Sequence, residues 1–197
     1  MTRIITSLSE ISESYDALFC DLWGCLHNGK TPYPAAVAAL QAFRAGGGKV
    51  ALVTNAPRPN ATVIAQLDRM GVPRDAWDLV VSSGDATQTA MLQGAVGQKV
   101  FHIGAVKDED FFTDLPEGAI APERVGLLEA EGIVCTGLED DLTETPDDYR
   151  AQLLLGKTRG LTMLCANPDI VVDMGDKRVF CAGAIAGAYE GMGGSAL

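Results

Sequence analysis

The stretch that decides the fold is residues 17–24, Ala-Leu-Phe-Cys-Asp-Leu-Trp-Gly. A short run of large apolar residues ends in one carboxylate, Asp21, and a glycine follows three residues later. This pattern predicts a buried strand that opens into a loop. In open α/β sheets, ligands bind just outside the carboxyl ends of the strands. Asp21 is therefore a candidate nucleophile or metal ligand, and the alternative is an aspartate that only caps a turn.

Two further segments repeat this pattern of an apolar run that ends in polar residues. The run at 50–53 is followed by polar residues 54–55, and the run at 79–81 is followed by serines at 82–83. Apolar residues recur at helical spacing between the successive runs, which predicts βαβ units and a parallel sheet. Because crossovers between parallel strands are right-handed, we expect all three polar strand ends along one edge of the sheet.

The alternation of strands and helices restarts at about residue 97, after a seam near residues 84–97. We therefore expect two α/β units. The predicted strands of the second unit lie at 99–104, 125–128, 132–136 and 161–166, and its predicted helices lie at 149–155 and 180–190.

Composition excludes several classes of protein. The chain has 197 residues and a net charge of −11 (15 basic minus 26 acidic residues), which argues against a nucleic-acid or anionic-membrane partner. The five cysteines are dispersed without C-x-x-C spacing, as is typical of free thiols in a reducing compartment. The chain has neither the pattern of a signal peptide nor an apolar run of 18 residues, so we expect a cytoplasmic protein.

The residues at the predicted strand ends favour phosphoryl transfer. Asp21 would attack phosphorus, Mg²⁺ would offset the repulsion between the carboxylate and the phosphate, and Thr54 would hold a phosphoryl oxygen. A phosphorylated small molecule remains compatible with the acidic chain, because backbone N–H groups and a metal ion can bind phosphate locally.

Three stretches together resemble the haloacid dehalogenase superfamily. They are residues 17–24, residues 50–56 (Val-Ala-Leu-Val-Thr-Asn-Ala) and residues 165–169 (Cys-Ala-Asn-Pro-Asp). The resemblance is closest to its subfamily IIA, which contains phosphatases of sugar phosphates and nucleotides. It implies an α/β protein with a Rossmann-like parallel-sheet core and a large inserted α/β cap domain of the C2 type.

The resemblance also implies domain boundaries and roles for individual residues. Residues 1–84 would form the N-terminal part of the core, 85–190 the cap domain, and 191–197 the start of a return to the core. The implied roles are an aspartyl-phosphate on Asp21, phosphate binding by Thr54, Asn55 and Gly24, and a Mg²⁺ ion bound by the carboxylate of Asp21 and the backbone carbonyl of Trp23.

The first departure from the family pattern lies two residues after Asp21. The family has a second aspartate there, which acts as general acid and base for the leaving group, whereas this chain has Trp23, which cannot titrate. His27 on the same loop is a candidate substitute, and the alternative is a histidine hydrogen-bonded to its own backbone. Superfamily members with an apolar or aromatic residue at this position include enzymes that cleave carbon–halogen bonds, which keeps that chemistry open.

The second departure concerns two later motifs of the family, Gly-Lys-Pro and Gly-Asp-x-x-x-x-Asp, which supply a lysine and further metal carboxylates. The 197 residues contain neither. Lys157 is interpreted as a solvated lysine at a helix end, and Gly175-Asp176 as a turn between short strands. The resemblance thus predicts a Mg²⁺-dependent phosphatase of a small phosphorylated metabolite that pairs as a homodimer. The alternative is a weakly active or inactive protein that binds a phosphorylated ligand or a partner.

Overall fold

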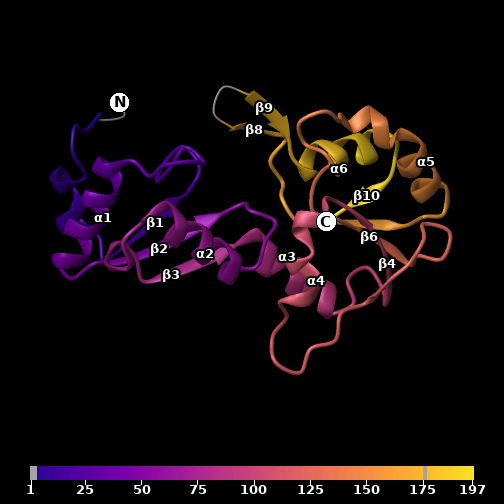
Figure 1. Ribbon diagram of the computed structural model, residues 1–197, viewed down its shortest axis with the longest axis horizontal. Coiled ribbons are helices and arrows are strands. Elements are labelled where there is room, and N and C mark those ends of the chain that lie inside the picture. The colour runs from indigo at the N-terminus through magenta and orange to yellow at the C-terminus, as the bar shows by residue number, and fades with distance from the viewer. Residues whose placement is uncertain (1–3, 175–176) are drawn as a thin grey trace. The chain divides into compact units, whose positions relative to one another are not determined.

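The computed structural model describes residues 4–174 and 177–197 (Figure 1). The chain divides into two compact units, one made of residues up to 54 together with 63–81, and the other of residues 55–62 together with 82–197. Each unit combines a sheet with helices. The predicted α/β class is therefore confirmed for both units.

The first unit contains a three-stranded sheet with the order β1-β2-β3. Strands β1 and β2 pair in parallel, and Asp21 at the end of β1 lies opposite Val53. The predicted alternation of strands and helices is confirmed in this unit. Its elements are β1 (Ala17–Asp21), α1 (Pro34–Ala45), β2 (Lys49–Thr54), α2 (Asn60–Met70) and β3 (Leu79–Ser82). The burial predicted for the first strand is wrong: β1 is an edge strand, none of its residues is buried, and Phe19 is 78% exposed.

Helix α1 shows why the first unit folds as its sequence predicts. Pro34 occupies the first turn, where its missing N–H leaves no helical hydrogen bond unmade. The buried residues Val37, Leu40 and Phe43 recur every three residues and so form one apolar face. Each of these side chains contributes about 1.5–3 kcal/mol when it is fully buried, so this face rather than intrinsic helix propensity holds the helix in place.

The second unit contains a five-stranded sheet with the order β10-β7-β6-β4-β5, in which every neighbouring pair is parallel. All four residues of the central strand β6 are buried, as expected for a parallel strand that is covered on both faces. The strands are β4 (Lys99–Ile103), β5 (Glu123–Arg124), β6 (Gly132–Cys135), β7 (Thr162–Cys165) and β10 (Ser195–Ala196).

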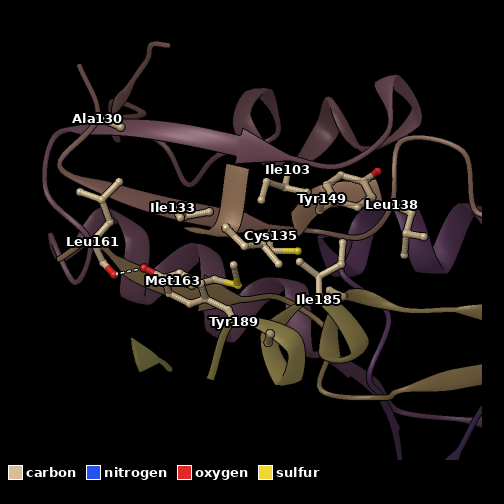
Figure 2. Packing of buried hydrophobic residues seen from close by; sticks show 13 residues of the cluster. Ile103, Ala130, Ile133, Cys135, Leu138, Tyr149, Leu161, Met163, Ile185 and Tyr189 are labelled. Carbon is tan, nitrogen blue, oxygen red and sulfur yellow. Dashed lines mark hydrogen bonds between the residues drawn. The ribbon is translucent and has the colours of Figure 1, made fainter. Parts of the chain in front are cut away.

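Two hydrophobic clusters cover the two faces of this sheet. Ile133 and Met163 belong to one cluster, together with residues of helices α5 (Arg150–Thr158) and α6 (Ala182–Gly191) (Figure 2). Residues Val134 and Leu164, one position further along each strand, belong to the other cluster with residues of α3 and α4. Successive strand residues thus face opposite helical layers. The helices of the second layer are α3 (Ser83–Leu92) and α4 (Asp110–Thr113).

Tyr189 of α6 is the largest fully buried side chain in the first of these clusters. Its hydroxyl donates a hydrogen bond of 2.6 Å to the backbone carbonyl of Leu161, drawn as a dashed line in Figure 2. A buried tyrosine needs such a partner, because an unpaired buried hydroxyl costs about 1–3 kcal/mol. This bond ties α6 to the beginning of β7.

Strands β8 (Val171–Met174) and β9 (Lys177–Phe180) form an antiparallel hairpin of their own. The turn predicted at residues 175–176 lies outside the described residues. The helix predicted from residue 180 begins at Ala182 instead, because Phe180 pairs with Val171 in the hairpin.

One other prediction differs from the structure. The strand predicted at 125–128 is wrong: β5 comprises Glu123–Arg124, and Leu128 is 72% exposed. The backbone of Glu123–Arg124 pairs with the edge of β4, which otherwise presents unpaired N–H and C=O groups. Within residues 191–197, Ser195–Ala196 pairs with β7 in the second sheet.

Among the residues that the structure describes, no helix is long and apolar enough to span a membrane. Short 3₁₀ helices complete the described part of the chain. They are η1 (Leu8–Glu10), η2 (Ser12–Ser14), η3 (Arg74–Ala76), η4 (Val106–Asp108) and η5 (Pro146–Tyr149).

Candidate functional site

Asp21 is the last residue of β1, and its side chain is exposed. Its Oδ1 atom accepts a hydrogen bond of 2.7 Å from the backbone N–H of Leu22, which orients the carboxylate at the start of the following loop. An ionised carboxylate has about four lone-pair positions, so one N–H donor leaves capacity for a metal ion or an electrophile. The structure therefore places Asp21 where the sequence predicted it, as an accessible carboxylate at a strand end.

The loop after Asp21 is held by its own backbone. The carbonyl oxygen of Leu22 accepts hydrogen bonds from the N–H groups of Leu26 and His27, and Leu22 and Leu26 are buried. Gly24 has a positive φ of 79°, a conformation that side-chain-bearing residues rarely adopt. Its N–H donates to the carbonyl oxygen of His27 at 2.8 Å. This bond gives the Gly24 amide a role within the loop, and the phosphate-binding role that the family resemblance implies for Gly24 stays a prediction.

The side chain of Trp23 folds back onto its own loop. A Cβ atom added to Gly29 would lie 2.5 Å from the indole, so the ring packs directly against this glycine. The ring also makes an edge-to-face contact with His27, with 5.6 Å between the ring centroids. Trp23 therefore supplies packing for the loop at the position where the family has an acidic side chain.

His27 is 2% exposed, and its Nδ1 atom accepts a 3.0 Å hydrogen bond from the backbone N–H of Gly29. Burial lowers the pKa of His27 below its usual value of 6.5. The ring is thus neutral at pH 7 and carries its proton on Nε2. The hydrogen bond to the loop backbone corresponds to the alternative that the sequence left open for His27, a histidine that holds its own loop.

Thr54 ends β2 and is 8% exposed. It lies one position beyond Val53, the residue that pairs with Asp21, so Thr54 and Asp21 end adjacent parallel strands of the first unit. The two residues therefore lie at the same edge of the sheet, as the sequence predicted for their positions.

Asn55 is exposed and belongs to the second unit. Its Nδ2 atom donates a hydrogen bond of 3.0 Å to Oδ1 of Asp169. The sequence pointed to both residues, as members of two separate motifs, but nothing in their spacing of 114 residues indicated that they pair.

Ser82, which ends β3, has a different role from the other strand ends. Its hydroxyl accepts the N–H of Asp85 at 3.0 Å as the N-cap of α3 and donates to the carbonyl oxygen of Arg58 at 2.7 Å. Both capacities of the hydroxyl are thus used by the protein's backbone.

The thiol beside the candidate nucleophile is not activated. Burial, with smaller contributions from Cys25 and Asp21, raises the pKa of Cys20 to about 11. Since the thiolate is the reactive form, Cys20 does not compete with Asp21 as a nucleophile at neutral pH.

The oxygen donors at this loop fit a magnesium site that the substrate helps to complete. The described residues contain no group of three or more His, Cys, Asp or Glu side chains that could hold a metal ion. Mg²⁺ is usually bound by one or two carboxylates together with substrate phosphates and water, rather than by an all-protein cage. The carboxylate of Asp21 and the backbone carbonyl of Trp23 are hard oxygen donors of the kind that such a site needs.

Comparison with known proteins identifies the family. A model of haloacid dehalogenase-like hydrolases matches residues 18–115. A hydrolase of the haloacid dehalogenase-like family from Brucella suis 1330 is 44% identical in sequence, with a TM-score of 0.92, and the match covers 98% of this chain and 69% of that chain. The chain belongs to the haloacid dehalogenase-like hydrolase family.

More distant structures share the fold of this haloacid dehalogenase-like chain. A glycerol phosphate phosphatase from Mycobacterium tuberculosis in complex with magnesium is 22% identical, with a TM-score of 0.67, 94% of this chain covered and 55% of that chain. A 4-nitrophenylphosphatase from Thermotoga maritima is 21% identical, with a TM-score of 0.66, 92% of this chain covered and 66% of that chain. The haloacid dehalogenase-like chain thus spans between about half and two thirds of the length of these two proteins. A comparison with curated proteins found no match.

Proposed function

We propose that this chain is a Mg²⁺-dependent phosphatase of a small phosphorylated metabolite, with Asp21 as the nucleophile. The observation that carries the proposal is the exposed carboxylate of Asp21 at the carboxyl end of β1, beside the strand that ends in Thr54. Membership of a hydrolase family and a fold shared with two phosphatases support it.

In the first step, an oxygen of Asp21 attacks phosphorus, a new P–O bond forms, and the bond between phosphorus and the ester oxygen breaks. The leaving group departs with the bonding electron pair and takes a proton from solvent. In the second step, water attacks the aspartyl-phosphate, gives up a proton, and releases inorganic phosphate together with the free carboxylate.

Thr54 and Asn55 are assigned to bind the phosphoryl oxygens. The hydroxyl and the amide N–H are neutral donors, and hydrogen bonds from them stabilise the negative charge on these oxygens during the reaction. Asp21 and the carbonyl of Trp23 would hold Mg²⁺, which when bound offsets the repulsion between the carboxylate and the phosphate. Residues 85–190 are assigned the role of a C2-type cap that selects the leaving group.

Trp23 and His27 distinguish this site from one with a built-in acid. The indole of Trp23 has no titratable group, and the single N–H proton of neutral His27 is on Nε2 of a side chain that is 2% exposed. We therefore assign His27 to loop positioning. Since a positioned acid typically contributes about 10²–10⁴-fold, the enzyme should favour esters whose leaving group departs without protonation.

The proposal is tested with purified protein, 4-nitrophenyl phosphate and Mg²⁺. Asp21→Asn should lower kcat by at least ~10³-fold, because the amide is a poor nucleophile. Asp16→Asn is the matched control: it removes one exposed carboxylate just before β1 and should leave kcat unchanged. Unchanged, metal-dependent phosphate release by Asp21→Asn would overturn the proposal.

The alternative is a protein that binds a phosphorylated ligand without turnover, which the tryptophan at position 23 favours. Calorimetry with a phosphate monoester discriminates the two. Tight binding without release of phosphate by the wild-type chain supports the alternative, and turnover excludes it. The remaining expectations, a cytoplasmic homodimer with no nucleic-acid or membrane partner, belong to the same proposal.

A further inference from the structure

The contact between Asn55 and Asp169 lies entirely within the second unit. Asp169 is itself fixed, because its backbone N–H donates to Oδ1 of Asn167 at 2.9 Å, which closes a turn after β7. The side chain of Asn55 is therefore held by the loop at the carboxyl end of β7.

The backbone around Asn55 is held by the start of α3. The carbonyl oxygen of Ala56 accepts the N–H of Gly84 at 3.0 Å, and the carbonyl oxygen of Arg58 accepts the hydroxyl of Ser82 at 2.7 Å. The N–H of Asn60 donates to Oδ1 of Asp85 at 2.9 Å. Residues 55–62 thus follow β2 in sequence but are positioned by the second unit.

The carboxylate of Asp169 determines which way the Asn55 amide points. An ionised carboxylate only accepts hydrogen bonds, so it must face the Nδ2 atom of Asn55, and the flipped amide would bring two acceptors together. An amide nitrogen carries two hydrogens. With one directed at Asp169, the second is presented in a fixed direction by an exposed side chain.

We propose that Asp169 is a positioning residue for phosphoryl binding, which acts by orienting the amide of Asn55. The inference rests on the proposed function, in which Asn55 binds a phosphoryl oxygen. It assigns to the turn after β7 a part in phosphate binding that is separate from selection of the leaving group. Two consequences follow: the effect of Asp169 requires Asn55, and it is the same whatever leaving group the substrate carries.

The test compares Asp169→Ala with Asp169→Asn, which keeps a side-chain oxygen that can accept from Asn55. Asp173→Ala is the matched control, because it removes an exposed carboxylate that is paired with Arg178. Asp169→Ala should lower kcat/KM for 4-nitrophenyl phosphate about 10-fold, equivalent to ~1.4 kcal/mol, and should weaken inhibition by inorganic phosphate by a similar factor. Asp169→Asn should recover most of the loss, and Asp173→Ala should show none.

Two readouts separate positioning from a structural or leaving-group role. With Asn55→Ala as background, adding Asp169→Ala should cost less than about twofold, because the orienting bond is already lost. The loss should also be equal for 4-nitrophenyl phosphate and glycerol phosphate. A loss confined to one substrate, or full additivity of the two variants, would overturn the inference, since Asp169 would then act without Asn55.

NMR of the Asn55 side-chain amide keeps this inference distinct from the proposed function. In the wild type, inorganic phosphate should shift the amide resonances, and Asp169→Ala should displace them and abolish that response. If the protein is an active phosphatase but phosphate does not shift the Asn55 amide resonances, this inference is wrong and the proposed function is retained. Absence of turnover together with a phosphate response that depends on Asp169 contradicts the phosphatase and supports the positioning role.

Discussion

The Nδ1 atom of His27 accepts a hydrogen bond from the backbone N–H of Gly29, with 3.0 Å between the two nitrogens. Gly29 has a φ of 86° and packs against the indole of Trp23. The imidazole, the glycine and the indole thus stabilise one loop conformation after Asp21, and this relationship decides how His27 should behave when it is replaced.

We expect His27→Gln to destabilise the protein without changing the chemistry. Loss of the buried hydrogen bond to Gly29 should reduce the free energy of unfolding by about 1–3 kcal/mol, measured by urea denaturation. The pH profile of kcat should keep its shape. If His27 were the general acid, the decline in kcat at higher pH would disappear in His27→Gln, and that result would contradict its assignment to loop positioning.

Restoring the family's acid at position 23 should change substrate preference. We expect Trp23→Asp to raise the ratio of kcat for glycerol phosphate to kcat for 4-nitrophenyl phosphate by ~10-fold or more, because an alkoxide needs protonation and nitrophenolate does not. Trp23→Asn is the control, since it removes the same indole packing without adding an acid. Equal ratios in the two variants would show that position 23 does not reach the leaving group.

The segment after β2 should respond to a change in α3. A Cβ at Gly84 would overlap the backbone of Arg58, so Gly84→Ala must displace residues 55–62. We expect KM for 4-nitrophenyl phosphate to rise severalfold in the folded variant. Gly187→Ala on α6, where a Cβ meets nothing within 4 Å, should leave KM unchanged and stabilise the helix by about 0.5–1 kcal/mol.

His102 should make the stability of the protein dependent on pH. Burial, assisted by the charge of Arg124, lowers the pKa of His102 from 6.5 to about 4. The unfolded chain therefore binds a proton that the folded chain does not, so stability falls as the pH falls from 6.5 towards 4, by up to about 3 kcal/mol.

The matched variant for this prediction is His102→Gln. In the wild type, the hydroxyl of Thr136 donates to Asp108 at 3.0 Å and therefore accepts from Nε2 of His102 at 2.9 Å, a bond that a glutamine amide can replace. The difference in unfolding free energy between pH 7 and pH 5 should be smaller in His102→Gln. An equal difference in both proteins would show that His102 does not account for the acid sensitivity.

Local patterns in the sequence were sufficient to predict most of the fold. The sequence places Asp21 and Thr54 at strand ends, because short apolar runs followed by polar residues are typical of parallel strands, and both residues do end strands. The burial expected from the same pattern holds for most of β2 but for no residue of β1. The two-residue strand β5 could not be found in this way, since Glu123–Arg124 has no strand-like pattern and pairs only because β4 offers a free edge. The apolar residues just after it, at 125–128, were therefore mistaken for the strand.

The hydrogen bond between Asn55 and Asp169 could not be predicted from the sequence either. It depends on the path of the chain after β7 and on the N-terminus of α3, which hold two distant segments against each other. Gly24 is a related case, because a glycine after the candidate nucleophile is compatible both with phosphate binding and with the positive φ that the loop requires. The hydrogen bond from its N–H to the carbonyl oxygen of His27 is a further feature that the sequence does not reveal.

The most direct test of the central claim is to trap the phosphorylated enzyme. The protein is mixed with excess 4-nitrophenyl phosphate and Mg²⁺, quenched in acid before the first turnover is complete, digested, and analysed by mass spectrometry. We predict a phosphoryl group on the peptide that contains Asp21, and its loss on treatment with hydroxylamine, which cleaves acyl phosphates. Release of nitrophenolate at the same time points with no phosphoryl group on that peptide, and with full turnover retained by Asp21→Asn, would contradict the account.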